Sequence, residues 1–266
     1  MDFAEFKQRQ SRTWGQGDYA VLSQLLAPAA RELCDACAVS AGQEVLDVAA
    51  GDGNFALACA EEGASVVATD LAPGMVERGM ARMRDEGVDV EWQVADAEAL
   101  PFGDGRFECA GSVFGVMLAP RPEVAARELF RVVRPGNTVG LTAWTPDSFP
   151  AEMFRIGRRY SPPPPDVPES SEWGHEDLVR RRLDGLAGTL DIERSTVTWE
   201  AESPEALVAL MERGSPPMAA ARQALPAERM EDMLGELLEL IRRLSGGDGP
   251  VAIEGEYLLI VARKRG

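Results

Sequence analysis

Lysine and histidine are scarce in this chain of 266 residues. Lysine occurs only at Lys7 and Lys264, and His175 is the single histidine. The scarcity of lysine argues against Schiff-base and lysine-nucleophile chemistry, both of which need a suitably placed amine. Because histidine occurs only once, His175 is the one imidazole that could act as a base near neutral pH.

Long apolar runs and excess positive charge are also absent. No apolar stretch is long enough to span a bilayer, and residues 1–7 lack the apolar region of a signal peptide. The formal net charge is −17, so the surface repels phosphate backbones and anionic lipids. We therefore expect a cytoplasmic protein that acts on a small molecule, without nucleic-acid or membrane partners. A homodimer stays open.

The four cysteines do not make a recognisable metal site. Cys34 and Cys37 have the C-x-x-C spacing, but Cys59 and Cys109 do not form a second such pair. The surrounding sequence is rich in Ala and Leu at helical spacing. We interpret the two thiols as small buried core residues and expect no metal.

Strand-like runs alternate with helix-like segments, which predicts an α/β fold built from βαβ units. Residues 1–40 have apolar side chains at helical spacing. Strands are expected at 44–49, 65–70, 90–95, 107–113, 138–144, 190–199 and 256–262. Helices are expected after them at 55–60, 73–86, 121–133, 176–186, 204–213 and 227–244.

The regular alternation breaks after residue 144. Residues 162–165 are four consecutive prolines, which exclude a helix or a central strand at that point. We predict an extended connection over 145–173 that serves as a spacer or a lid. Because ligands of open α/β sheets bind beyond the carboxyl ends of the strands, we expect residues 145–175 to border the substrate cavity. The apolar wall would come from Trp144, Phe149 and Trp173.

A glycine-rich turn follows the first expected strand. Residues 47–54 read Asp-Val-Ala-Ala-Gly-Asp-Gly-Asn, and such glycines let a ligand approach the backbone closely. Asp70 ends the second strand, where dinucleotide-binding folds place the acid that accepts hydrogen bonds from ribose. The spacing Gly51-x-Gly53-x-x-Ala56 also fits the dinucleotide fingerprint. An NAD(P)-dependent oxidoreductase therefore stays open at this point.

Three further motifs favour a different family. Residues 96–102 (DAEALPF) follow the third strand, 106–110 (RFECA) lead into the fourth, and 131–136 (RVVRPG) precede the fifth. In order and spacing they resemble the class I S-adenosylmethionine-dependent methyltransferases, and specifically the group related to the ubiquinone and menaquinone methyltransferases. The resemblance covers about residues 40–145.

The resemblance implies a fold and a division of the chain. The fold would be a Rossmann-like, doubly wound sheet of seven strands, mostly parallel with one antiparallel strand near 257–262. N-terminal helices and a helical cap or lid would complete it. We expect an N-terminal helical segment (1–40), an S-adenosylmethionine-binding core (41–145), a lid or insert (146–189), and the rest of the sheet with inserted cap helices (190–266).

The resemblance also implies S-adenosylmethionine as the cofactor and assigns residues to it. The glycine-rich turn would lie against the methionine part, Asp70 would hold the ribose, and Asp96 would accept from the adenine amino group. Met75 would pack on the adenine, and Phe114 would face the reacting methyl group. The expected cofactor-binding residues are Tyr19, Asp47, Ala49, Ala50, Gly51, Gly53, Asp70, Leu71, Met75, Asp96, Ala97, Glu98, Phe114 and Val116.

The sequence departs from the family pattern in two places. Ala49 replaces the first glycine of the D-x-G-x-G-x-G motif, and its methyl group is tolerable if the φ angle of this residue is negative. Relatives tend to carry aromatic residues in the region that corresponds to 211–218, where this chain has none. Substrate assignments therefore do not transfer across that region.

Methyl transfer from a sulfonium chiefly requires an aligned nucleophile and exclusion of water. A general base is needed only where the nucleophile must first lose a proton. His175 and Tyr19 are the candidate bases, although His175 equally fits an exposed position in the first turn of a helix. We expect proximity to be the main mechanism. A relative that binds S-adenosylmethionine without transferring its methyl group also stays open.

Overall fold

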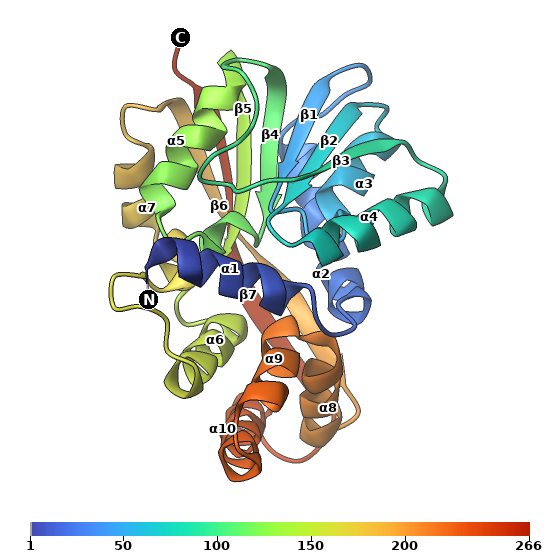
Figure 1. The fold of residues 1–266 in the computed structure, drawn as a ribbon, viewed down its shortest axis with the longest axis vertical. Coiled ribbons are helices and arrows are strands. Elements are labelled where there is room, and N and C mark those ends of the chain that lie inside the picture. Colours follow the sequence, from blue (N-terminus) through green and yellow to red (C-terminus); the bar gives the residue numbers. More distant parts are fainter. Residues whose placement is uncertain (1) are drawn as a thin grey trace.

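The computed structural model describes residues 2–266 and contains a single seven-stranded sheet (Figure 1). The strands are β1 (Glu44–Val48), β2 (Ser65–Asp70), β3 (Val90–Val94), β4 (Phe107–Val113), β5 (Val133–Trp144), β6 (Ala187–Ala201) and β7 (Val251–Lys264). Their order in space is β3-β2-β1-β4-β5-β7-β6. Strands β1 to β5 pair in parallel, whereas β7 pairs antiparallel with both β5 and β6. The predicted mostly parallel sheet with one antiparallel strand beside its edge is confirmed.

Helices connect the strands and cover the sheet. The α-helices are α1 (Phe3–Trp14), α2 (Ala20–Ala36), α3 (Asn54–Glu61), α4 (Pro73–Glu86), α5 (Pro122–Val132), α6 (Phe149–Tyr160), α7 (Glu176–Leu183), α8 (Pro204–Gly214), α9 (Pro216–Ala224) and α10 (Ala227–Ser245), with short 3-10 helices η1 (Val116–Leu118) and η2 (Ser170–Gly174). The β1-α3-β2 and β4-α5-β5 crossovers run in opposite directions along the sheet. Because such crossovers are right-handed, α3 and α5 lie on opposite faces. No helix between residues 2 and 266 has the length and apolar character needed to cross a membrane.

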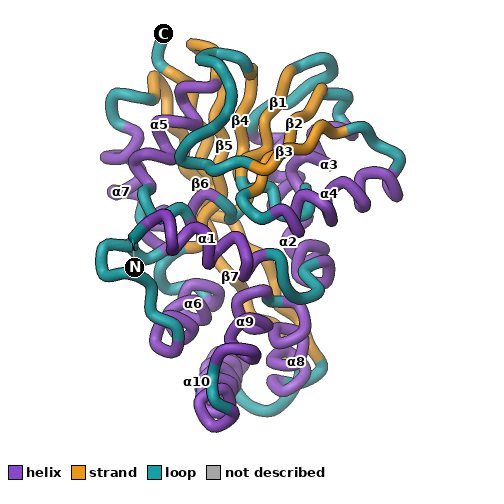
Figure 2. The backbone as a smooth tube through the Cα atoms, in the orientation of Figure 1, coloured by secondary structure: helices purple, strands orange, loops and turns teal. Residues whose placement is uncertain are grey.

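The long strands β6 and β7 extend beyond the parallel part of the sheet and carry a second group of helices. Helices α6 and α10 contact β7, α8 contacts β6, and α9 contacts α8 and α10. Figure 2 shows these helices below the sheet and α1 crossing between them and the ends of the parallel strands.

The core follows directly from the apolar pattern of the central strands. Val45, Leu46 and Val48 of β1 are fully buried, as a strand covered on both faces requires. All four cysteines are buried thiols, and Gly140 of β5 leaves the space that the Cys37 sulfur occupies. The interpretation of the C-x-x-C pair as core residues therefore agrees with the structure.

Residues 145–173 are not the continuous extended connection that the proline run suggested. Helix α6 occupies Phe149–Tyr160 and η2 occupies Ser170–Gly174, so only residues 145–148 and 161–169, which include the proline run, lie in loops. The hydroxyl of Ser148 caps α6 by accepting a hydrogen bond from the Ala151 amide, and Pro150 lies in the first turn, where its missing N–H costs nothing. The expectation was wrong because it extended the effect of the four prolines to residues 145–160, where Ser148 and Pro150 signal the start of a helix. Helix α9 was not predicted either.

Candidate active site

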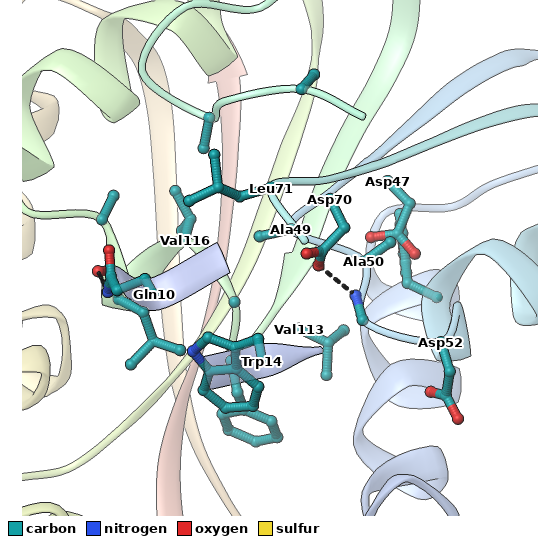
Figure 3. A pocket seen from close by; sticks show the side chains of 18 of the residues that line it. Gln10, Trp14, Asp47, Ala49, Ala50, Asp52, Asp70, Leu71, Val113 and Val116 are labelled. Atoms are coloured by element: carbon teal, nitrogen blue, oxygen red, sulfur yellow. Dashed lines mark hydrogen bonds between the residues drawn. The ribbon is translucent and has the colours of Figure 1, made fainter. Parts of the chain in front are cut away.

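A pocket lies at the carboxyl ends of β1, β2 and β4, under helix α1 (Figure 3). The sequence-predicted cofactor residues converge on it from these three strands and from the loop after β3. Eleven of the predicted residues line the pocket, namely Tyr19, Asp47, Ala49, Ala50, Gly51, Asp70, Leu71, Asp96, Ala97, Phe114 and Val116.

Three predicted residues do not line this pocket. Gly53 packs against Trp92, whose ring lies 2.9 Å from where a Cβ atom of residue 53 would stand, and its φ angle is +93°. Met75 is buried within α4. The carboxylate of Glu98 is buried and forms ion pairs with Lys7 and Arg121. In the structure Gly53 and Met75 pack against neighbouring side chains and Glu98 belongs to an internal ion-pair network, while their cofactor roles stay predictions.

Asp70 fixes the glycine-rich turn by its side chain. One carboxylate oxygen accepts a hydrogen bond from the Gly51 amide at 2.9 Å (dashed line in Figure 3), and the other accepts from the Ala72 amide at 2.8 Å. Burial raises the pKa of Asp70 to about 6, while these backbone hydrogen bonds act in the opposite direction. Each carboxylate oxygen retains a lone pair for a donor from a ligand.

Asp47 combines a structural contact with an unused acceptor. Its Oδ2 atom accepts from the Ala56 amide at 2.9 Å near the start of α3, whereas its buried Oδ1 atom has no hydrogen-bond partner. Burial raises the pKa of Asp47 to about 8, and repulsion from Asp70 and Asp52 adds to the increase. An unpartnered buried acceptor at a pocket wall indicates a place for a donating or cationic ligand group.

Helix α1 contributes pocket residues that the sequence interpretation did not assign to the cofactor site. Lys7, Gln10 and Trp14 all line the pocket and are spaced along one face of the helix. The Gln10 side chain donates to the Leu118 carbonyl at 2.9 Å, and the Ser11 hydroxyl donates to the Leu71 carbonyl at 3.0 Å. The helical spacing of these residues was a usable signal, but only the fold shows which face of α1 is covered.

Two residues at the pocket have backbone conformations that usually require glycine. Ala49 and Phe114, which follow β1 and β4, both have φ angles of +54°. The condition under which the Ala49 methyl group would be accommodated without strain, a negative φ angle, is therefore not met. A Cβ atom on the neighbouring Gly115 would lie 2.3 Å from the Ala49 carbonyl oxygen, so the two loops are in direct contact. Close packing of these loops holds both residues in the left-handed region.

The two candidate bases occupy different surroundings. Tyr19 lines the pocket, and burial, reinforced by Asp52 and Asp70, raises the pKa of its hydroxyl above the ordinary range. Such a phenol stays protonated and can donate a hydrogen bond, but it is a poor base near neutral pH. His175 is exposed at the start of α7 and lines neither this pocket nor the cavity next to it. The structure therefore supports neither residue as the general base.

A second and larger cavity adjoins the first. The two share Gln10, Trp14, Leu118 and Ala119 as a common wall. The segment after β5 borders the second cavity, as expected of a lid, but not through the side chains that were expected. Met153 and Phe154 of α6 line it, among others, whereas three large aromatic residues are buried in the core instead, namely Trp144, Phe149 and Trp173.

Comparison with known proteins identifies the family. A family model described as a methyltransferase domain matches residues 45–136. The chain is 36% identical over 260 residues to the uncharacterised protein Rv1405c of Mycobacterium tuberculosis. The aligned region covers 95% of this chain and 93% of that protein. It is also 40% identical over 104 residues to a demethylmenaquinone methyltransferase of Clavibacter sepedonicus, spanning 39% of this chain and 42% of that protein.

Among solved structures, the YcgJ protein of Bacillus subtilis has the same fold. Its TM-score is 0.62 at 20% sequence identity, over 90% of this chain and 99% of that one. The sequence matches decide against the oxidoreductase that the glycine pattern left open. With a seven-stranded sheet and a pocket at its carboxyl edge, the chain belongs to the class I S-adenosylmethionine-dependent methyltransferases.

Proposed function

We propose that this enzyme transfers a methyl group from S-adenosylmethionine to a small, largely apolar organic molecule. The observation that carries the proposal is the pair of adjoining cavities with a common wall at Gln10, Trp14, Leu118 and Ala119. The first cavity contains the cofactor motifs of the family. The second is lined mainly by apolar side chains and is large enough for an acceptor molecule.

The charge of the first cavity suits this cofactor. Asp47, Asp52, Asp70 and Asp96 line it. Lys7, the only cation among the described lining residues, pairs with Asp96 and Glu98, and Arg82 from outside the lining pairs with Asp52. S-adenosylmethionine carries a sulfonium and an ammonium group, both positively charged. A cavity with an excess of carboxylates attracts such a ligand, and the unpartnered Oδ1 atom of Asp47 offers it an acceptor.

The lining residues suggest how each part of the cofactor would be held. Asp70 would accept hydrogen bonds from ribose hydroxyls with its remaining lone pairs, while Asp96 and Ala97 would face the adenine. Phe114 and Val116, which also line this cavity, would direct the sulfonium end toward the second cavity. When bound, S-adenosylmethionine supplies a methyl group that is already activated for displacement.

The chain itself would contribute alignment and exclusion of water. Helix α1 covers the first cavity and is held there by Lys7, Gln10 and Ser11, so the reacting groups are shielded from solvent. Within residues 2–266, no histidine, aspartate or glutamate lines the second cavity. We therefore propose catalysis by proximity and desolvation, without a general base from this wall.

Calorimetric titration of the purified protein with S-adenosylmethionine, S-adenosylhomocysteine and NADH tests the cofactor. We expect the first two to bind and NADH not to bind; tighter binding of NADH would overturn the proposal. Release of S-adenosylhomocysteine is then followed with a panel of apolar small molecules. Cofactor binding with no turnover across a broad panel would favour a relative that keeps the cofactor without transferring its methyl group.

A further inference from the structure

The second cavity has the opposite charge from the first. Aspartate and glutamate supply 44 of the 266 residues, yet neither lines the second cavity, whereas Arg9, Arg12 and Arg158 do. The first cavity, in contrast, is lined by four aspartates. In a chain with a net charge of −17, a cavity lined by arginines alone among charged residues departs strongly from the rest of the molecule.

On helix α6, the arginine that lines the second cavity differs from its neighbours in having no carboxylate partner among residues 2–266. The three arginines of this helix lie close together in the sequence, and Arg155 and Arg159, which do not line the cavity, pair with Glu169 and Glu236. Arg158, which does line it, forms no salt bridge with any of residues 2–266. Its guanidinium instead donates to the carbonyls of Pro168 and Val167 at 2.9 Å each. Those two bonds hold the guanidinium in place without neutralising its charge.

The two arginines of α1 are likewise without carboxylate partners. Arg9 is half-buried and stacks over the Phe6 ring at 5.3 Å from its centre, and Arg12 is exposed. Neither forms a salt bridge with any residue that the structure describes. A guanidinium that is partly buried and not neutralised attracts an anion more strongly than one in bulk water.

The rest of the lining defines the body of the ligand. Most of it is apolar, with Met153, Phe154 and Met218 contributing large flexible or aromatic surfaces. One polar group has no partner, because the buried Oε1 atom of Gln16 receives no hydrogen bond. That acceptor offers a position for a hydroxyl or N–H group of a ligand.

We propose that the acceptor substrate is an amphipathic organic anion, with an apolar body in the second cavity and an acidic group held by Arg9, Arg12 and Arg158. This proposal rests on the proposed function, which makes the second cavity the acceptor site. The opposite charges of the two cavities would also sort the ligands, because the cationic methyl donor is attracted to one and the anionic acceptor to the other.

Three probes of matched shape test the charge preference. The probes are 2-naphthoate, 2-naphthylmethanol and 2-naphthylmethylammonium, which have the same aromatic body with a negative, neutral or positive group. Each is titrated calorimetrically into the full-length protein saturated with S-adenosylhomocysteine. We expect naphthoate to bind at least about tenfold more tightly than the other two, which is the size of effect expected for a charge-assisted hydrogen bond.

Variants locate the preference. Arg9→Gln and Arg12→Gln should each reduce the affinity for naphthoate about three- to tenfold and leave that for naphthylmethanol unchanged. Arg158→Lys keeps the positive charge but loses the guanidinium that donates to the Pro168 and Val167 carbonyls. This variant therefore separates the effect of the charge on binding from the effect of the contact with that loop. Arg84→Gln is the matched control, because Arg84 is exposed on α4, lines neither cavity and forms no salt bridge.

The outcomes separate this inference from the proposed function. Binding of S-adenosylhomocysteine with equal affinity for the three probes, or with the ammonium probe binding most tightly, would overturn the anion preference and leave the methyltransferase proposal intact. Absence of binding by all three probes would also overturn it. A failure to bind S-adenosylhomocysteine would instead defeat the proposed function itself.

Discussion

The Lys7 ammonium lies 2.6 Å from the Oδ2 atom of Asp96, which joins the first helix to the loop after β3. The same ammonium pairs with the buried carboxylate of Glu98, and Glu98 in turn binds Arg121. One of only two lysines in the chain thus connects the helix that covers the cofactor pocket to the carboxylate assigned to the adenine. With Asp96 in its proposed role at the adenine, cofactor binding and the position of α1 would be linked through this contact.

Lys7→Met should destabilise the protein by about 1–3 kcal/mol, because it leaves Asp96 without its cationic partner and removes one of the two cations that neutralise Glu98. Urea unfolding without cofactor measures the loss. Arg84→Met, at an exposed position with no ion pair, should change stability by less than about 0.5 kcal/mol. Adding Asp96→Asn to Lys7→Met should recover part of the loss, since the two residues interact. Equal losses in the Lys7 and Arg84 variants would contradict this account.

Asp70→Ala should weaken S-adenosylmethionine binding about ten- to a hundredfold, because charge-assisted hydrogen bonds to the ribose would be lost. The structure adds a second effect that the strand-end position alone did not indicate. The Gly51 and Ala72 amides lose their acceptor, so the variant should also lose about 1–3 kcal/mol of stability. Asp70→Asn keeps one acceptor oxygen and should be milder in both respects. Calorimetry and thermal unfolding check the two effects, and unchanged cofactor affinity in a folded Asp70→Ala variant would refute the assignment.

Cofactor affinity should rise with pH between about 5 and 8. In the free protein burial raises the pKa of Asp70 to about 6 and that of Asp47 to about 8, from an ordinary value of 3.8. A cationic ligand favours the ionised carboxylates, so binding lowers both pKa values and releases protons. Calorimetry in buffers of different ionisation enthalpy counts the released protons. Proton uptake, or none, at pH 7 would be inconsistent with this prediction.

The same two acids should make the free protein less stable as pH rises. Their pKa values are higher in the folded than in the unfolded state. Their contribution to the free energy of unfolding is therefore fully present below pH 4 and is lost as the pH rises towards 8. The Asp47→Asn variant should therefore lose less stability than the wild type between pH 5 and pH 8. Unfolding curves at the two pH values for both proteins give the comparison, and parallel pH profiles would count against it.

Ala49→Gly should relieve backbone strain, because a φ angle of +54° costs an alanine about 1–2 kcal/mol. The added freedom of glycine in the unfolded chain offsets part of that gain. Ala50→Gly provides the matched control, since residue 50 is the next alanine in the same turn and its φ angle is not positive. The difference in stability between the two variants should be about 1–2 kcal/mol in favour of Ala49→Gly. A difference near zero would mean that Ala49 is not strained.

The parallel core was predictable because its signals are local. Strands β1, β2 and β4 are short, mostly apolar runs and β3 alternates apolar and polar residues, and each stops at a turn, so strand ends and the residues just after them could be placed from the sequence. Asp70 and Asp96 reached the same pocket for that reason. The antiparallel position of β7 came from the family resemblance, because its apolar pattern alone does not fix the strand beside which it pairs.

The parts that failed depend on contacts between distant segments. Glu98 was assigned to the cofactor because it stands next to Asp96 and Ala97, but Lys7, 91 positions earlier, takes its carboxylate. The prediction of an aromatic cavity wall was wrong for a similar reason. Trp144 and Phe149 contact other aromatic rings in the core, Phe114 and Trp199 among them, and only the three-dimensional packing of β5, β6 and α6 brings these rings together.

His175→Ala should change turnover less than about twofold, because His175 is exposed and lines neither cavity. Removal of a general base would instead lower turnover about 10²- to 10⁴-fold. Tyr19→Phe tests the second candidate base. Burial and the nearby Asp52 and Asp70 raise the pKa of Tyr19, so its hydroxyl stays protonated over the pH range of the assay. This variant should weaken cofactor binding only a few fold and should leave the pH dependence of turnover unchanged. Release of S-adenosylhomocysteine, measured at saturating cofactor from pH 6 to pH 9 with an acceptor from the panel, decides the matter. A pH-dependent limb that disappears in either variant would identify that residue as a base and would replace proximity as the main mechanism.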